Sequence, residues 1–284
     1  AHPLVEIHEA EAVTDAVWHR PGLAELTTRG GRYRARLVVG ADGVRSLIRH
    51  KLGLEMPRGR RQRFGVRAHF AFGDHRPLED YVTVQLDGLG ECYTTPVSET
   101  ELEVALLLEK PFMKSFGGRL EEAFDAYLQD APAMRSRLVG AQRISPVIAC
   151  GPFDVWARRR VADRAVLVGD AGGYLDPLTG EGISLALQSA FWAAEVIDRA
   201  LRRDDLSEAS LLPYHTRMNQ ATRHYKFLTR ALLTVVRHGR LATLVAQRLS
   251  RCPELYSELL AINCGVRTFW QLRPRDLYRF LFPR

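Results

Sequence analysis

Hydrophobic and polar residues alternate through the middle of the chain. Every second residue is apolar over residues 64–72, and the same alternation returns at residues 82–86 and 102–108. A period of two places the apolar side chains on one face of a β-strand, which is typical of half-buried antiparallel sheets. We therefore predict an antiparallel sheet over residues 62–110.

The segments on either side of this sheet indicate shorter strands and helices. A helix is predicted over residues 120–128 and a return strand over residues 142–149. Before the sheet, short apolar runs separated by turn residues predict further strands. These strands are expected at residues 4–7, 12–18, 23–28 and 32–39, the last two as a hairpin, and a helix is expected at residues 44–52.

A second region of strand and helix follows the sheet. Residues 161–168 form an apolar run that predicts a strand, and a glycine-rich turn comes after it. From Gly182 onward apolar residues recur at helical spacing, which predicts a long helix with a buried face. That face is expected to contain Ile183, Ala186, Leu187, Ala190, Ala194, Ile197 and Leu201. Beyond Leu211 the chain is predicted to be mostly helical, with a break at Pro253.

The order of these elements indicates an α/β (α+β) protein. Strand–turn–helix units at both ends, with antiparallel sheet between them, favour one discontinuous domain that carries an inserted sheet domain. We expect the first domain at residues 1–60 and 151–210, the antiparallel-sheet domain at residues 61–150, and a helical C-terminal region at residues 211–284.

Composition narrows the class of protein. The 284 residues are 46% hydrophobic and 26% charged, which is typical of a soluble globular protein. No run is long and apolar enough for a membrane span. The four cysteines show no close pairing and no metal-ligand spacing, which favours reduced thiols in a cytoplasmic protein and predicts no metal site. They are Cys92, Cys150, Cys252 and Cys264.

The net charge of +7 is unevenly distributed. Between Ala209 and Pro253 the chain has eight basic residues and no acidic one. A basic helical face in water is one interpretation of this surplus, and attraction to an anionic membrane surface, an acidic partner or an anionic substrate is the other. Peripheral membrane contact through this region would make the cytoplasmic protein membrane-associated. We predict no nucleic-acid partner.

The strongest chemical signal is the segment of residues 166–183. A buried strand delivers Asp170 to its carboxyl end, where ligands bind in open α/β folds. Glycines near this acid let the backbone approach a planar or polyhydroxylated ligand, and a carboxylate accepts hydrogen bonds from hydroxyl groups. Pro177 stiffens the loop that follows. Gly180 and Gly182 then open a helix whose free amides favour negative charge.

A second segment, residues 35–46, has a similar layout. Its apolar strand ends in Gly40, and Asp42-Gly43 lies at the centre of a strand-to-helix turn. Glycines in such a turn expose backbone amides, and Arg45 is placed to meet a phosphate.

Together the two segments resemble the internal motifs of the para-hydroxybenzoate hydroxylase-like flavoproteins. That superfamily includes aromatic hydroxylases, flavin-dependent halogenases and geranylgeranyl reductases. The resemblance rests on Gly169-Asp170-Ala171, on Asp176-Pro177 with Gly180 and Gly182, and on the Asp42-Gly43 turn about 130 residues earlier. It implies an FAD-binding Rossmann-like domain with an inserted substrate domain, and NAD(P)H as the expected electron donor.

The resemblance also implies roles for individual residues. Asp170 would hold a ribityl hydroxyl of FAD, and residues 177–182 would line its isoalloxazine ring. The Asp42 turn would support FAD, and its Asp and Arg would help NAD(P)H to bind. The residues expected to contact the cofactor are Asp42, Gly43, Arg45, Gly169, Asp170, Ala171, Pro177, Gly180, Gly182 and Ile183.

The middle sheet takes the position of the family's substrate domain. Residues 88–96 resemble, more weakly, a strand that reductases and halogenases place over the flavin, so Tyr93 is the candidate substrate-cavity residue. An ordinary strand tyrosine is the alternative. Arg67 and His69 on the polar face of the first sheet strand are candidates to touch substrate, with simple exposure to water as the alternative. No catalytic acid or base is predicted.

The chain departs from the family pattern at two places. The chain has no G-x-G-x-x-G sequence to bind the FAD pyrophosphate, so we expect Ala1 to be a truncation point, or the first βαβ unit to come from a separate chain. Hydroxylases place a histidine where this chain has residues 172–174, and residues 176–182 are closer to the geranylgeranyl reductase-like branch.

The expected function is that of an FAD-dependent oxidoreductase. It would use NAD(P)H or another donor to reduce or hydroxylate a hydrophobic or aromatic small molecule. Reductase and monooxygenase both stay open, and a halogenase is less favoured because its catalytic lysine would belong to the missing region. The alternative is a non-catalytic remnant or partial subunit that needs a G-x-G-x-x-G unit to bind FAD.

Overall fold

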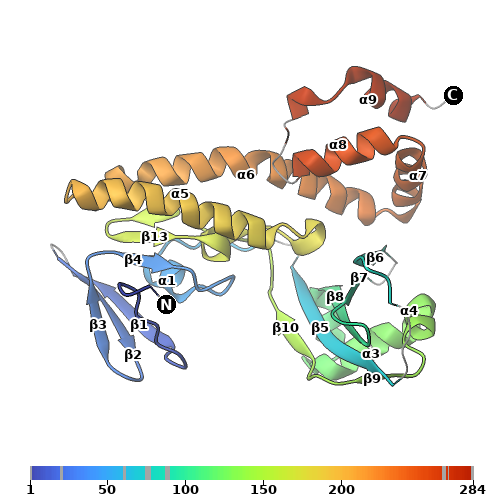
Figure 1. Ribbon diagram of the computed structural model, residues 1–284, viewed down its shortest axis with the longest axis horizontal. Coiled ribbons are helices and arrows are strands. Elements are labelled where there is room, and N and C mark those ends of the chain that lie inside the picture. The colour runs from blue at the N-terminus through green and yellow to red at the C-terminus, as the bar shows by residue number, and fades with distance from the viewer. Residues whose placement is uncertain are drawn as a thin grey trace. The chain divides into compact units, whose positions relative to one another are not determined.

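The computed structural model describes residues 2–19, 22–59, 62–73, 78–86, 90–263, 267 and 269–282. Ala1, Cys264, and Gly88 with Leu89 of the expected substrate strand lie outside the described residues. The chain has a mixed α/β fold, as predicted (Figure 1). It divides into two compact units. Unit 1 comprises Ala1–Pro57, Val155–Tyr174 and Glu181–Thr222, and unit 2 comprises Arg58–Asp154, Leu175–Gly180 and Arg223–Arg284. The domain boundaries expected from the sequence stay a prediction.

Among the described residues, unit 1 contains two three-stranded sheets, a two-stranded sheet and helices. Its strands are β1 (Val13–Trp18), β2 (Ala24–Thr28), β3 (Arg32–Ala35), β4 (Val38–Gly40), β11 (Val155–Trp156), β12 (Val161–Ala162), β13 (Ala165–Leu167) and β14 (Gly173–Tyr174). The first three form an antiparallel sheet in the order β1-β2-β3, the second sheet has the order β12-β13-β4, and the two-stranded sheet pairs β11 with β14. Because β13 and β4 pair in parallel, their carboxyl ends meet at one edge.

The helices of unit 1 are α1 (Leu47–Lys51), α5 (Gly182–Arg202) and α6 (Glu208–Val236), the last belonging to unit 1 as far as Thr222. Side chains of α5 and α6 share a core with β12 and β13. In Figure 1 the two helices lie beside each other along β13. Small residues of α5, such as Ala193 and Ala200, are buried in that core. Tyr214 of α6 donates a hydrogen bond from its hydroxyl to the Leu167 carbonyl at 2.8 Å, so the helix is tied to the strand.

The long helix begins at Gly182 as predicted, but its predicted buried face is wrong. Ile183 and Leu187 are 77% and 68% exposed. The buried face is instead made by Ser189, Ala193, Val196 and Ala200. Small side chains let α5 lie close to the sheet, and the larger apolar side chains of its first turns line a cleft. Helical periodicity alone does not distinguish a core face from a cleft face.

Four predicted strands differ from the structure. Residues 4–7 are exposed and form no strand. Residues 32–39 divide into β3 and β4, which belong to different sheets. Residues 161–168 form the β12–β13 hairpin, because the chain reverses at Arg164, whose φ of 60° lies in the left-handed region. The return strand of residues 142–149 is also divided in two, on either side of Ser145-Pro146, since proline has no N–H to donate.

Unit 2 is built on one antiparallel sheet. Its strands are β5 (Arg63–Phe72), β6 (Thr83–Leu86), β7 (Glu91–Pro96), β8 (Glu101–Glu109), β9 (Ala141–Arg143) and β10 (Ile148–Cys150). They are ordered β10-β5-β8-β7-β6, with β9 also pairing with β5. The helices are α2 (Lys110–Ser115), α3 (Leu120–Asp130), α4 (Pro132–Arg137), α7 (Gly239–Ser250), α8 (Pro253–Asn263) and α9 (Pro274–Leu281).

The two faces of this sheet have different surroundings. One face carries the alternating apolar residues of β5 and β8, and it packs on Phe124, Tyr127 and Leu128 of α3. The opposite face borders a cavity. In the part of the chain that the structure describes, we find no helix with the length and hydropathy to cross a membrane.

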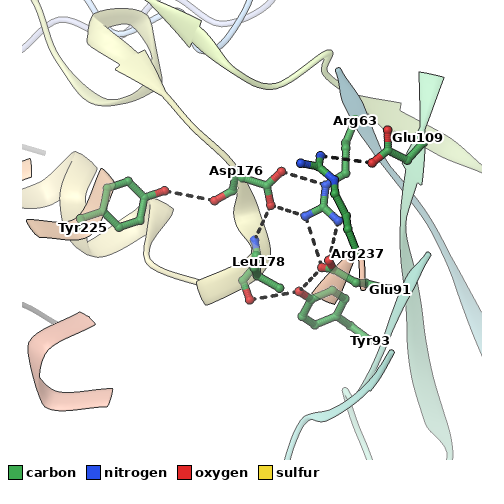
Figure 2. Close-up of polar contacts among 8 residues, drawn as sticks. All are labelled: Arg63, Glu91, Tyr93, Glu109, Asp176, Leu178, Tyr225 and Arg237. Carbon is green, nitrogen blue, oxygen red and sulfur yellow. Dashed lines mark hydrogen bonds and ion pairs between the residues drawn. The ribbon is translucent and has the colours of Figure 1, made fainter. Parts of the chain in front are cut away.

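A buried ion cluster joins three segments of unit 2. Figure 2 shows Arg63 at the start of β5 between two carboxylates. Its guanidinium makes two hydrogen bonds to Asp176 and two to Glu91 of β7, and all three side chains are buried. Asp176 also accepts a hydrogen bond from the Leu178 amide at 3.0 Å. The hydroxyl of Tyr93 lies 3.2 Å from a Glu91 carboxylate oxygen and 3.1 Å from the Leu178 carbonyl, and these two acceptors share its single proton.

Tyr225, in the part of α6 that belongs to unit 2, donates its hydroxyl proton to the Asp176 carbonyl at 3.1 Å (Figure 2). Arg237, the residue after α6, donates to Glu109 of β8 at 3.2 Å. Burial raises the pKa of Glu91, although the Arg63 guanidinium opposes that change. The cluster therefore fixes residues 176–178 against β5 and β7 by charge as well as by hydrogen bonds.

We expect Arg63→Met to lower the free energy of unfolding by about 3 to 5 kcal/mol, because it leaves two carboxylates buried without a counter-charge. Arg67→Met on the same strand is the matched control, since its side chain is half-exposed and its loss costs roughly 1 kcal/mol or less. Urea unfolding measures both. A triple change that also introduces Glu91→Gln and Asp176→Asn should recover most of the loss. Equal losses from the two arginine variants would contradict the cluster's role.

The pH dependence of stability gives a second prediction. Glu181, at the start of α5, is 7% exposed, and burial raises its pKa from 4.5 to about 7. The folded state therefore holds the Glu181 proton more tightly than the unfolded state does. The free energy of unfolding falls as pH rises through the window from 4.5 to about 7. Glu181→Gln should remove this fall and stabilise the protein above the window by about 1 to 3 kcal/mol. Chemical unfolding at pH values below and above the window measures the change in stability, with exposed Glu195→Gln as the control. A Glu181→Gln protein with the same pH dependence of stability as the unmodified chain would contradict the prediction.

Candidate functional site

Unit 1 contains a cleft of about 520 Å³ where β4 and β13 end. The residues after β4 and after β13 form one wall, and the first turns of α5 form another. The lining consists of Ala41, Gly43, Val168, Gly169, Asp170, Tyr174, Gly182, Ile183, Ala186, Leu187 and Ala190. The carboxyl edge of parallel strands is where open α/β sheets bind ligands. The cleft is therefore the candidate ligand site of unit 1.

Two glycines shape the wall after the strands. Gly43 and Gly169 have φ angles of +74° and +56°, which L side chains rarely adopt. A Cβ on Gly169 would also lie 3.3 Å from the Cβ of Ala186 on α5. The Gly169 amide donates to the buried Ser189 hydroxyl at 2.8 Å, which ties this turn to the helix. Glycine is thus required where the turn approaches α5.

Asp170 supplies the only carboxylate among the residues that line this cleft. Its side chain is half-buried, and burial raises its pKa. Within the described residues, no hydrogen bond or ion pair holds that carboxylate. A desolvated acceptor with free lone pairs suits a ligand that donates hydrogen bonds, such as a polyhydroxylated chain.

Arg49 supports the walls of the cleft without lining it, and the sequence prediction missed this residue. It is buried in α1, and its guanidinium donates to the backbone carbonyls of Val44 at 2.6 Å and of Ala171 at 2.9 Å. These bonds connect the turn after β4 with the turn after β13. An arginine in a short helix has no distinctive spacing, and only the parallel pairing of the two strands places it between the turns.

The amino end of α5 contributes backbone polarity to the cleft. The helix begins at Gly182 without a side-chain cap, so its first amides are not satisfied by the preceding residue's side chain. Gly182 lies close to Tyr174, because a Cβ there would be 3.2 Å from the tyrosine hydroxyl. Such a helix end favours negative charge on a bound group.

The predicted cofactor residues fall into three groups. Gly43, Gly169, Asp170, Gly182 and Ile183 line the cleft together. Asp42, Arg45 and Ala171 are not among its lining residues. Asp42 accepts from the Ile48 amide of α1 at 3.0 Å, Arg45 is exposed, and Ala171 is buried. Pro177 and Gly180 belong to unit 2 and line its cavity.

Unit 2 contains a cavity of about 370 Å³ on the open face of its sheet. Its lining is mostly apolar and comes from β5, β7, β8 and β10 and from the segments around Phe153 and Pro177. The residues are Gly65, Val66, Arg67, Tyr93, Thr95, Glu103, Ala105, Leu106, Leu107, Ile148, Ala149, Cys150, Phe153, Pro177 and Gly180. An apolar cavity with a few polar groups is typical of small-molecule sites.

The candidate substrate residues have defined partners. Tyr93 lines the cavity, but its hydroxyl is held by Glu91 and the Leu178 carbonyl, and burial raises its pKa. Arg67 lines the cavity and lies 3.6 Å from Glu103 and 2.8 Å from the His69 ring. His69 is not among the lining residues.

The cysteines differ in exposure. The Cys150 thiol is exposed and lines the cavity, whereas Cys92 and Cys252 are buried. In the described ranges, no group of three or more His, Cys, Asp or Glu side chains is placed to hold a metal ion.

Comparison with known proteins identifies relatives with stated activities. A 1H-pyrrole-2-carbonyl-(peptidyl-carrier protein) chlorinase of Pseudomonas fluorescens is 23% identical over 237 residues, 79% of this chain and 53% of the relative. A digeranylgeranylglycerophospholipid reductase of Methanococcus vannielii is 28% identical over 199 residues, 69% of this chain and 48% of the relative. The chain thus spans about half the length of these relatives.

Solved structures and a family profile agree with these relatives. The crystal structure of CmlS, a flavin-dependent halogenase, matches 78% of this chain and 42% of its own with 26% identity and a TM-score of 0.68. The profile of the FAD binding domain family matches residues 8–225, which is more than half of the chain. The chain therefore belongs to the FAD binding domain family of the FAD-dependent oxidoreductase superfamily, and the resemblance seen in its sequence is confirmed.

Proposed function

We propose that this protein is an FAD-dependent oxidoreductase that acts on a hydrophobic or aromatic small molecule. The flavin and ribityl parts of FAD would occupy the cleft of unit 1, and the substrate would occupy the cavity of unit 2. NAD(P)H or another donor would supply the electrons. The observation that carries the proposal is the unpaired Asp170 carboxylate in a glycine-shaped cleft at the carboxyl ends of two parallel strands.

The residues of the cleft fit FAD in three respects. Asp170 has free acceptor positions for a ribityl hydroxyl, and its partial burial strengthens such a bond. Ile183 and Leu187 offer exposed apolar side chains to a planar ring. The amino end of α5 favours the negative charge that a reduced flavin carries. The bound flavin would supply the redox step, while the protein orients it and sets its electrostatics.

The cavity of unit 2 supports an apolar substrate. Its floor consists of Ala105 and Leu107 of β8, and its polar groups are few. The Arg63 cluster holds residues 176–178, so Pro177 is a fixed part of the cavity wall. Tyr93 would shape this wall without transferring a proton, because its hydroxyl is already engaged and its pKa is raised.

A second candidate function rests on the sequence itself. The chain contains no G-x-G-x-x-G segment to bind the FAD pyrophosphate. It would then need that unit from elsewhere to retain FAD and would have no activity unaided. Purification separates the candidates: a yellow protein with flavin absorbance supports the enzyme, and a colourless protein that ignores added FAD supports the second candidate.

Substituting Asp170→Ala should weaken FAD binding by about 1 to 3 kcal/mol, the size of a lost charged hydrogen bond. Equilibrium dialysis with FAD measures the change. Asp198→Ala, which removes an exposed carboxylate from α5, is the matched control and should leave the affinity unchanged. An Asp170→Ala protein with the affinity of the unmodified chain would exclude Asp170 from the site.

A larger side chain in the cavity should impair substrate binding and leave FAD affinity unchanged. Ala105→Trp fills space beside Leu107, so kcat/KM for apolar substrates should fall by at least tenfold, the equivalent of roughly 1.4 kcal/mol. Val84→Trp on exposed β6 is the control. The assay is substrate-dependent NADPH oxidation with and without oxygen, since oxygen dependence distinguishes a monooxygenase or halogenase from a reductase. Full activity of Ala105→Trp would move the substrate site elsewhere.

A further inference from the structure

The positive charge of the chain is concentrated in its C-terminal quarter. Residues 209–284 include thirteen basic and three acidic residues, a net charge of +10, whereas the complete chain has +7. The preceding 208 residues are therefore slightly acidic. Several of these arginines are exposed and, among the described residues, have no carboxylate within ion-pair distance: Arg223, Arg230, Arg240, Arg251, Arg273 and Arg279. Among the described residues, no carboxylate of the protein neutralises these six guanidinium groups.

Helix α9 presents its apolar side to water. Asp276 is buried and Phe280 is half-buried, so these two positions mark the face that packs on the protein. The opposite face consists of Leu277, Tyr278 and Leu281, all exposed, and exposed Phe282 follows at the helix end. An amphipathic helix in a soluble protein normally has the reverse arrangement. The outward apolar face is therefore exposed to water in the isolated chain.

This face is held in place and is not a frayed end. The Arg248 guanidinium of α7 donates to the carbonyls of Phe280 at 3.1 Å and Leu281 at 3.0 Å. Figure 1 shows α9 beside α8, with which it is in contact. The rings of Tyr278 and Phe282 pack together with centroids 5.0 Å apart. The exposed aromatic surface is a built part of unit 2.

Basic and aromatic side chains border the apolar face. Arg275 and Arg279 are one turn apart and lie beside it on the helix. Trp270, in the turn before α9, is 88% exposed. Arginine, tryptophan and tyrosine around an apolar stripe are the residues that place a helix in the plane of a membrane interface, because the rings enter the headgroup layer while the arginines meet lipid phosphates.

We propose that α9 and the turn before it dock on an anionic lipid bilayer. The apolar face would enter the headgroup boundary, and the surrounding arginines would bind the lipid phosphates. Complementary charge favours this occupant over a second copy of the chain, because two surfaces with the same excess of arginine repel each other. The proposal does not depend on the chemistry proposed for units 1 and 2.

The test is co-sedimentation of the full chain with vesicles of phosphatidylcholine alone or mixed with phosphatidylglycerol. We expect binding to the mixed vesicles only, and weaker binding as salt is added. Tryptophan emission should shift to shorter wavelength on binding, and Trp270→Phe should abolish that shift. The double variant Arg275→Gln with Arg279→Gln should bind roughly thirtyfold more weakly, since each arginine near an anionic surface contributes about fivefold.

A matched double variant distinguishes binding through the arginines of α9 from a general attraction between a positively charged protein and the vesicle. Arg119→Gln with Arg135→Gln removes the same charge from exposed positions around α3 and α4 and should change binding little. Leu281→Ser with Phe282→Ser should abolish binding while FAD affinity is retained. Three outcomes would overturn the proposal: no binding to mixed vesicles, equal losses from both arginine pairs, or a vesicle-free dimer that the Leu281 and Phe282 changes convert to monomer.

Discussion

Unit 2 depends on the burial of one positive charge. Moving a guanidinium out of water is costly, and contacts with carboxylates or other hydrogen-bond acceptors must compensate for that cost. Arg63 obtains that compensation from Glu91 on β7 and from Asp176, which lie 28 and 113 residues away in the sequence. The position of the Pro177 turn follows from this requirement, because Asp176 caps that turn with the same carboxylate that meets Arg63. The wall of the unit 2 cavity is therefore placed by electrostatics.

The sheet of unit 2 and helix α5 each use one face for packing and the other face to line a candidate site. The sheet of unit 2 buries its strictly alternating face against α3, and its other face forms the cavity floor. Helix α5 buries its small residues against β12 and β13, and its larger apolar residues line the unit 1 cleft. In each case packing uses the face that allows the closest approach. The remaining apolar surface is left for a ligand.

Local patterns predicted much of this architecture. The period-two alternation of β5 and β8 and the start of α5 at Gly182 were evident, because each depends on neighbours within a few residues. Glycines after strands likewise indicated the cleft.

Long-range pairing was not visible in the sequence. Arg49 and Arg63 join segments more than a hundred residues apart. The sequence around either residue does not indicate which residue it bonds to. The predicted buried face of α5 was wrong because apolar residues at helical spacing are found both on faces packed in a core and on faces that line a cleft. Asp42, expected at the cofactor, accepts a hydrogen bond from the Ile48 amide of α1, which its position before the helix did not indicate.

The division of the chain has a consequence for how it folds. The backbone passes between the two units five times, after residues 57, 154, 174, 180 and 222, so neither unit is a continuous stretch. A single proteolytic cut leaves them covalently joined by the other connections. Neither unit can be completed during synthesis until its last segment, beyond residue 180 for unit 1 and beyond residue 222 for unit 2, has emerged. We expect the two units to acquire stability late and together, as loop closure between distant segments requires.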